Sequence, residues 1–148
     1  MSMGFGLRDH TADVAVEATA SDLAGAFSAV ADGLTAAACD DVPDPGTAAA
    51  EFGVSVAAEG REALLFDYLD QLIYERDVRG VLPVWNRATV DGPAARAESD
   101  GTAWRLEATA RGVPLATVDA REIKAVTYSE MRVEPTDTGW TVYVVFDV

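Results

Sequence analysis

The sequence contains very few of the side chains that catalytic and metal sites most often use. It has 148 residues but only one lysine, one histidine and one cysteine. Because Cys39 stands alone, no intrachain disulfide can form, and packing explains a small residue between Ala38 and Asp40 better than nucleophilic chemistry does. The sequence has no nucleophile, base and acid set, no phosphate-binding glycine loop and no zinc-ligand spacing. These absences argue against an enzyme that acts by itself.

Long apolar runs are also missing. No stretch approaches the roughly 18 uninterrupted apolar residues of a membrane span, and the N-terminus lacks the charged and then apolar pattern of a secretory signal. We therefore expect a cytoplasmic protein. A chain of 148 residues with 49% hydrophobic content is long enough for one domain with a core and short for two. The sequence predicts a single domain over residues 1–148.

Positive charge is scarce, because 25 acidic residues outnumber 11 basic ones and leave a formal charge of -14. Binding to a nucleic acid backbone depends on clustered lysine and arginine, so direct RNA binding is disfavoured. The composition fits a cytoplasm of high ionic strength, where the Debye length falls to about 3 Å at 1 M salt. Acidic surface residues are then the default, and Asp67 and Asp70 are interpreted as solvated charges on a helix face.

Apolar periodicity predicts two helices and several strands. Helical spacing covers residues 21–38, with Ser21 as N-cap, and residues 61–77, with Gly80 available to end the second helix. Alternation predicts strands at 8–19, 51–58, 81–90, 95–99, 102–110, 123–134 and 140–147, with hairpin turns at 100–101 and 135–139. This order indicates an α+β fold in two layers, in which two helices pack on one face of a mainly antiparallel sheet.

The only lysine, Lys124, lies in the predicted strand 123–134. Every other cation is an arginine, so arginine would have served equally well for a generic positive charge at this position. A compact ammonium is the property that distinguishes Lys124. The alternative is that one lysine among eleven cations arose by chance.

The last predicted strand is followed at once by two neighbouring carboxylates, the side chain of Asp147 and the α-carboxylate of Val148. Their repulsion is relieved by a proton, a basic side chain or a hard cation, and ligation by oxygen alone favours Ca²⁺, Mg²⁺ or Mn²⁺ over zinc. The alternative is a frayed, solvated chain end. Alternation in the strand at 8–19 puts Val14 on the core face and Asp13 on the opposite face.

Five motifs in order carry a resemblance to a known family. They are His10-Thr11-Ala12-Asp13-Val14, Ala26-Phe27, Leu64-Leu65-Phe66-Asp67-Tyr68-Leu69-Asp70, Lys124-Ala125-Val126-Thr127-Tyr128 and an Asp-aliphatic ending. At these spacings, and over essentially the whole chain, they resemble the archease family. The resemblance implies a two-layer domain with a divalent-cation site at Asp13, Asp147 and Val148. It also implies a functional role for Lys124 and for His10, although a structural hydrogen bond explains a lone histidine as well.

Archeases act as accessory proteins of the GTP-dependent RNA-splicing ligase, whose guanylylation and multiple turnover they promote. The resemblance therefore implies a non-enzymatic activator in tRNA splicing, which binds the ligase and neither RNA nor a membrane. Two alternatives stay open. A metal-dependent phosphoester hydrolase would use the same carboxylates to activate water, and a chaperone-like binding module would need an exposed apolar patch.

The chain departs from the family pattern at three places. Many archeases have a glutamate where Val113 stands and a histidine in the region of residues 118–119. Ser129 follows Tyr128 at a position where some members have histidine. Ligands or contacts that the family takes from these positions are therefore in doubt here.

Overall fold

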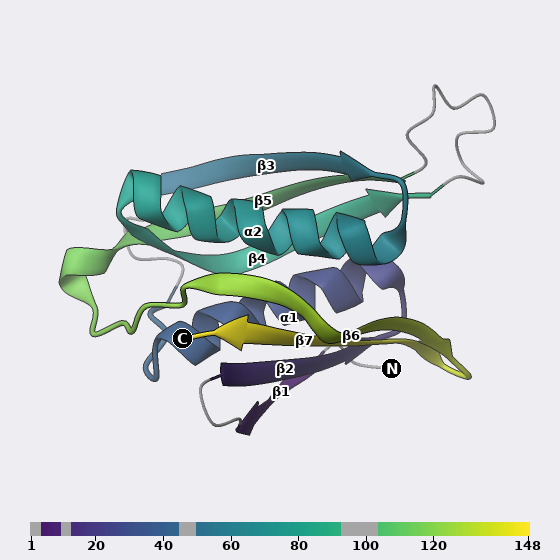
Figure 1. The fold of residues 1–148 in the computed structure, drawn as a ribbon. Helices are drawn as coiled ribbons and strands as arrows, with labels where there is room; N and C mark the ends of the chain where they lie inside the picture. Colours follow the sequence, from purple (N-terminus) through teal and green to yellow (C-terminus); the bar gives the residue numbers. More distant parts are fainter. Residues whose placement is uncertain (1–3, 10–12, 45–49, 93–103) are drawn as a thin grey trace.

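The computed structural model describes residues 4–9, 13–44, 50–92 and 104–148 (Figure 1). These residues form two helices, seven strands and a 3₁₀ turn. In chain order they are β1 Gly4–Asp9, β2 Asp13–Ala20, α1 Leu23–Ala38, β3 Ala50–Ala58, α2 Arg61–Arg79, β4 Val81–Asp91, β5 Trp104–Pro114, the 3₁₀ turn Leu115–Thr117, β6 Ala125–Thr136 and β7 Gly139–Asp147.

The strands divide into two antiparallel sheets, which lie one above the other in Figure 1. The four-stranded sheet has the order β1-β2-β7-β6, and the three-stranded sheet has the order β3-β5-β4. Every strand pairing is antiparallel. The predicted α+β fold, with two helices and antiparallel strands, is confirmed, and the strands that were expected in one sheet are shared between two.

Each helix packs on the face of one sheet and beside an edge strand of the other. Helix α1 contacts β1, β2 and β7 of the four-stranded sheet and also β4, whereas α2 contacts the three-stranded sheet and also β6. One apolar core results, and its largest fully buried side chains include Phe27 of α1, Tyr68 of α2 and Phe146 of β7. Neither described helix has the length and apolar content that a membrane crossing requires.

Several element boundaries differ from the predictions. The predicted strand at 8–19 is confirmed over residues 13–19, which belong to β2, but its start at residue 8 is wrong, because residues 8 and 9 belong to β1. The two strands pair from Gly4↔Thr19 to Asp9↔Val14. The N-cap of α1 is Asp22 and not Ser21, since Asp22 Oδ1 accepts a hydrogen bond from the Gly25 N–H at 2.7 Å. The predicted strand at 95–99 and its turn lie outside the described residues.

Helix α2 follows its predicted apolar stripe closely. The buried residues of the helix are Leu64, Leu65, Tyr68, Leu69, Leu72, Ile73 and Arg76. Gly80 ends it with a φ of 67°, the left-handed conformation that glycine adopts without a steric penalty. The stripe explains why α2 lies flat on the three-stranded sheet (Figure 1). Cys39, at the end of α1, is buried in the core, as expected for a packing residue.

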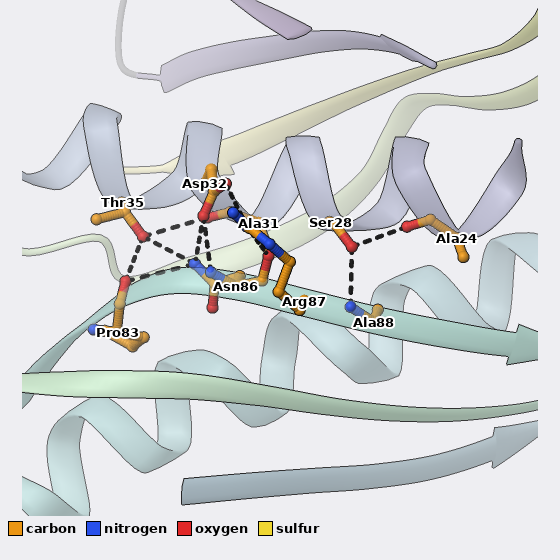
Figure 2. A network of polar contacts seen from close by, with 9 residues as sticks. All are labelled: Ala24, Ser28, Ala31, Asp32, Thr35, Pro83, Asn86, Arg87 and Ala88. Carbon is orange, nitrogen blue, oxygen red and sulfur yellow. Dashed lines mark hydrogen bonds and ion pairs between the residues drawn. The ribbon is translucent and has the colours of Figure 1, made fainter. Parts of the chain in front are cut away.

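Side chains of α1 take the place of a neighbouring strand along the edge of β4 (Figure 2). Asp32 Oδ1 accepts hydrogen bonds from the main-chain N–H and from Nδ2 of Asn86, both at 2.9 Å. Ser28 Oγ accepts a third from the Ala88 N–H at 2.8 Å. Because an edge strand exposes unpaired N–H groups, these contacts satisfy donors that water or another chain would otherwise take. They also hold the two sheets together.

Replacing Asn86 by alanine should lower the free energy of unfolding by about 2 kcal/mol, because a fully buried amide and its side-chain hydrogen bond to Asp32 are lost. The measurement is urea unfolding followed by circular dichroism.

The matched control is Thr89→Ala on the same strand, where an exposed hydroxyl donates to the Glu107 carbonyl oxygen. This change should cost no more than about 0.5 kcal/mol. Equal losses for the two variants would contradict the importance of the contact between α1 and β4.

Candidate functional site

Two of the predicted site residues lie side by side at one end of the four-stranded sheet. Asp13, the first residue of β2, pairs with Asp147, the last residue of β7. Asp147 also pairs with Ala125, the first residue of β6. Directly opposed residues of antiparallel strands have Cβ atoms about 4.5–5.5 Å apart and point to the same face. These three opposed residues, Asp13, Asp147 and Ala125, are called the acidic row after its two carboxylates.

The alternation of the strands turns the acidic row away from the core. The next residues along the three strands, Val14, Phe146 and Val126, form the adjacent row and face the core, and Phe146 is fully buried. The acidic row therefore lies on the outer face of the sheet, where Asp147 is exposed and Asp13 partly so. The predicted position of Asp13 opposite the core face is confirmed.

Lys124 comes directly before β6 and not inside it, so its predicted place in a strand is wrong by one residue. Its main-chain N–H nevertheless donates to the Asp147 carbonyl oxygen at 2.8 Å, which fixes Lys124 next to the acidic row. Its side chain is exposed, while the preceding Ile123 is fully buried. The main chain of Lys124 is thus held at the strand end that carries Asp147.

A buried arginine of α2 holds the chain that leads to Lys124. Arg76 has 7% of its surface exposed, and its Nη2 donates to the Ile123 carbonyl oxygen at 2.9 Å. The same guanidinium is neutralised by Asp77, with Nη2 to Oδ1 at 3.0 Å. Since hydrogen bonds of charged groups are stronger than neutral ones, Arg76 anchors this segment firmly to the helix.

The other predicted site residues are only partly described. Val148 is 41% exposed at the end of β7, next to Asp147. His10 lies outside the described residues, so its role stays a prediction. Within the four described stretches, no three side chains of His, Cys, Asp or Glu come together as a metal site would require. A cation at the acidic row would therefore need a main-chain oxygen in addition to the two carboxylates.

A long bulge in β6 begins within the lysine motif, and no pattern in the sequence predicts it. The pairing with β7 shifts between Thr127 and Arg132, and Glu130 has a φ of 58°, which is rare for a residue with a side chain. Thr127 holds the start of the bulge, because its hydroxyl donates to the Val145 carbonyl oxygen at 3.0 Å and accepts from the Ser129 N–H at 3.2 Å. The threonine of the motif is thus structural.

The tyrosine of the motif stacks on α2 at this bulge. The rings of Tyr128 and Phe66 are 4.2 Å apart between centroids and nearly parallel, at 8°. Partial burial and the nearby Asp67 carboxylate raise the pKa of Tyr128, and burial together with Asp70 raises the pKa of Asp67. Asp67 and Asp70 are exposed, in agreement with their interpretation as solvated charges. No pattern in the sequence predicted this contact between α2 and β6.

Val113, which stands where many archeases have a glutamate, packs into the core. It is 5% exposed and pairs with Leu82 across β4 and β5. The hydrophobic contact explains a valine here in physical terms. No carboxylate is therefore contributed from this position.

Comparisons with known proteins agree with the fold and with the motifs. Residues 5–148 match the profile of the archease protein family (MTH1598/TM1083). The chain is 34% identical over 144 residues to the protein archease of Thermococcus gammatolerans, with 95% of each chain covered. It is 32% identical over 143 residues to that of Archaeoglobus fulgidus, covering 95% of this chain and 96% of the relative.

Solved structures show the same architecture. The solution structure of Methanobacterium thermoautotrophicum protein 1598 has a TM-score of 0.78 and 28% identity, and the match covers 98% of this chain and 99% of that one. The crystal structure of a Thermotoga maritima archease, described as a possible chaperone, has a TM-score of 0.62 and 23% identity over 95% and 94% of the two chains. At that identity the second likeness concerns the fold alone.

Two antiparallel sheets, bridged by two helices, define a small α+β protein. Its candidate site lies at a sheet end, where Asp13 pairs with Asp147 and the Lys124 main chain bonds to Asp147. The family match extends over nearly the whole chain. The chain belongs to the archease family.

Replacing Arg76 by methionine should release the segment before Lys124, because methionine keeps the apolar stem but leaves the Ile123 carbonyl oxygen without its donor. The loss should be about 1–3 kcal/mol of unfolding free energy. Hydrogen exchange of the Lys124 amide should also become about tenfold faster or more, since local opening precedes exchange.

The control is Arg79→Met, three residues further along α2, where the arginine side chain is 48% exposed and pairs with Glu75. Amide exchange at Lys124 should stay as in the unchanged protein. If both variants raise the exchange rate equally, Arg76 does not hold this segment specifically.

Proposed function

We propose that the protein is an accessory activator of the GTP-dependent RNA-splicing ligase, which promotes guanylylation and multiple turnover of the ligase and is not an enzyme by itself. The observation that carries the proposal is the pairing of Asp13 with Asp147, with the Lys124 N–H bonded to the Asp147 carbonyl oxygen. Three motif residues distant in sequence therefore meet at one sheet end. Family membership supports the same role.

Asp13, Asp147 and a main-chain oxygen of Val148 are the proposed ligands of a divalent cation. Two carboxylates held opposite each other on one face suit a hard cation, because only oxygen donors are offered. Ca²⁺ is the proposed ion, with Mn²⁺ or Mg²⁺ as alternatives. A bound cation supplies a concentrated positive charge at this sheet end, and the two strands keep its carboxylate ligands in register.

Lys124 is proposed to act on the partner and not on the fold. Its side chain is exposed, and the peptide unit that joins it to Ile123 is fixed by Arg76 at the carbonyl oxygen and by Asp147 at the N–H. A fixed main chain with a free ammonium presents the charge outward at small entropic cost. His10 belongs to the same motif as Asp13, and either a structural hydrogen bond or a contact with the partner accounts for it.

The charge of the chain favours a protein partner over RNA. A formal charge of -14 repels phosphates, whereas it complements a basic rim around the active site of a nucleic-acid enzyme. The proposed partner is therefore the ligase itself, with no direct contact to RNA or to a membrane, and the proposed location is the cytoplasm.

One observation favours a second candidate, a chaperone-like binding module. Phe5, Val42 and Trp85 are large apolar side chains with 43%, 43% and 50% of their surface exposed. All three line one hollow. Exposed apolar patches mark sites of protein interaction, so binding of protein clients is compatible with this surface.

Replacing Asp147 by asparagine should weaken the binding of Ca²⁺ or Mn²⁺ by about tenfold or more, because one of two anionic ligands loses its charge. Isothermal titration calorimetry of the full chain with each metal chloride gives the affinities.

Asp137→Asn serves as the matched control, since Asp137 is an exposed carboxylate in the turn at the far end of the same hairpin. Its affinity should equal that of the unchanged protein. Equal affinities for all three proteins would remove the cation from the acidic row.

Replacing Lys124 by alanine should reduce activation of the ligase by about tenfold or more while the melting temperature stays within a few degrees, since an exposed side chain contributes little to packing. The assay measures RNA joining by purified cognate ligase with limiting ligase and excess RNA. Lys124→Arg separates the need for a compact ammonium from the need for charge.

Three outcomes would count against the proposal. Full activation by Lys124→Ala removes the assigned role of the lysine. Phosphoester hydrolysis by the purified protein without ligase favours the hydrolase. A stable complex with tRNA exon halves in a gel-shift experiment without ligase brings back direct RNA binding.

A further inference from the structure

A hollow of about 260 Å³ lies where β1, the chain after α1 and the edge strand β4 meet. Its lining is mainly apolar and includes Phe5, Val42 and Trp85, which are three of the exposed large hydrophobic side chains described in this protein. Asp32 is the charged residue that lines it. Apolar groups from three separate segments thus converge around one concave surface. They form a cluster and are not single exposed residues spread over the surface.

Trp85 occupies a backbone position that is unfavourable for it. The pairing of β4 with β5 shifts between Val84 and Arg87, and Trp85 lies at this bulge with a φ of 55°. Residues with a large side chain rarely adopt a positive φ, and such strain persists where the surrounding structure enforces it, often at functional sites. The same residue leaves half of its surface exposed.

The exposed indole is held in a defined orientation. The Arg87 guanidinium lies over the ring at 5.4 Å from its centroid, and its Nη1 is 3.5 Å from Asp32 Oδ2. Asp32 is in turn fixed by its hydrogen bonds to Asn86 (Figure 2). Arg87 and Asp32 thus hold the indole ring at the rim of the hollow. Tryptophans held rigidly in this way carry much of the binding energy in protein interfaces.

We propose that this hollow, which we call the Trp85 hollow, is a docking site for another protein that inserts an apolar side chain flanked by positive charges. The apolar lining selects the inserted side chain. The formal charge of -14 selects the flanking cations, since the Asp32 carboxylate at the lining is already paired with Arg87 and Asn86. A second copy of this chain would bring two strongly acidic surfaces together, so it is the disfavoured occupant.

The probe is the peptide acetyl-Lys-Thr-Leu-Thr-Lys-amide, added to the full chain and followed through the three tryptophan indole N–H signals in NMR. The Trp85 signal should shift in a saturable way, while Trp104 and Trp140, which do not line the hollow, stay in place. Peptides with alanine for leucine, or glutamate for both lysines, should each bind about tenfold more weakly, because each lacks one of the two selected features.

Two variants separate docking from folding. Trp85→Gly removes the ring and relieves the positive φ together, so peptide binding, read from the remaining signals of the hollow, should be lost while the melting temperature changes by only a few degrees. Tyr74→Ala removes an exposed aromatic ring from α2, outside the hollow, and should leave binding intact.

Four results would overturn the proposal, the first three with the peptides and the Trp85→Gly variant. These three are a Trp85 signal that no peptide moves, equal binding of the lysine and glutamate peptides, and a large loss of stability in Trp85→Gly, which would make the ring structural. A dimer of the unchanged protein in light scattering that Trp85→Gly dissolves would assign the hollow to a second copy, against the proposed partner.

Discussion

The contact between α1 and the edge of β4 is the interaction on which the rest of this structure depends. Among the described residues the two sheets share no strand, and the packing between them is made by the helices and the apolar core. Thr35 Oγ1 donates to the Pro83 carbonyl oxygen at 2.5 Å, and Asp32 and Ser28 accept from main-chain donors of the same strand. Buried polar groups are costly when unpaired, so this strand can lie beside α1 only where those side chains are present.

The same arrangement explains where the backbone is strained. Among the described residues, Trp85 and Glu130 are the two with a side chain and a positive φ. Each lies in an irregular part of an edge strand that runs beside a helix of the other layer, β4 beside α1 and β6 beside α2. Bulges bend an edge strand and increase its twist, which lets it follow a helix where no strand partner is available. The strain is therefore a consequence of joining two sheets through helices.

The sequence predicts the features that depend on residues close together in the chain, and it does not predict those that depend on pairing between distant strands. The helix stripes and the hairpin of β6 and β7 depend on local spacing and turns, so periodicity finds them. The split into two sheets depends on which strands pair, and alternation is identical for any partner. The pairing of Asp13 with Asp147 came from the family motif and not from periodicity. Trp85 carried no signal at all, because a bulge is recognised in sequence by glycine, and tryptophan stands there.

The two proposals together assign binding of the partner and action on the partner to two different surfaces of the protein. Phe5 of β1 pairs with Ala18 of β2, and Ala18 lies five residues along β2 from Asp13. At the rise of a β-strand, Asp13 is therefore about 17 Å from the point where β2 meets Phe5. At high ionic strength, with a Debye length of about 3 Å at 1 M salt, charge alone gives an acidic surface little hold on a basic partner. An apolar anchor keeps its strength under those conditions, because salt does not screen burial of apolar surface. The Trp85 hollow then supplies the binding energy, and the acidic row with Lys124 is left free to act on the partner's active site.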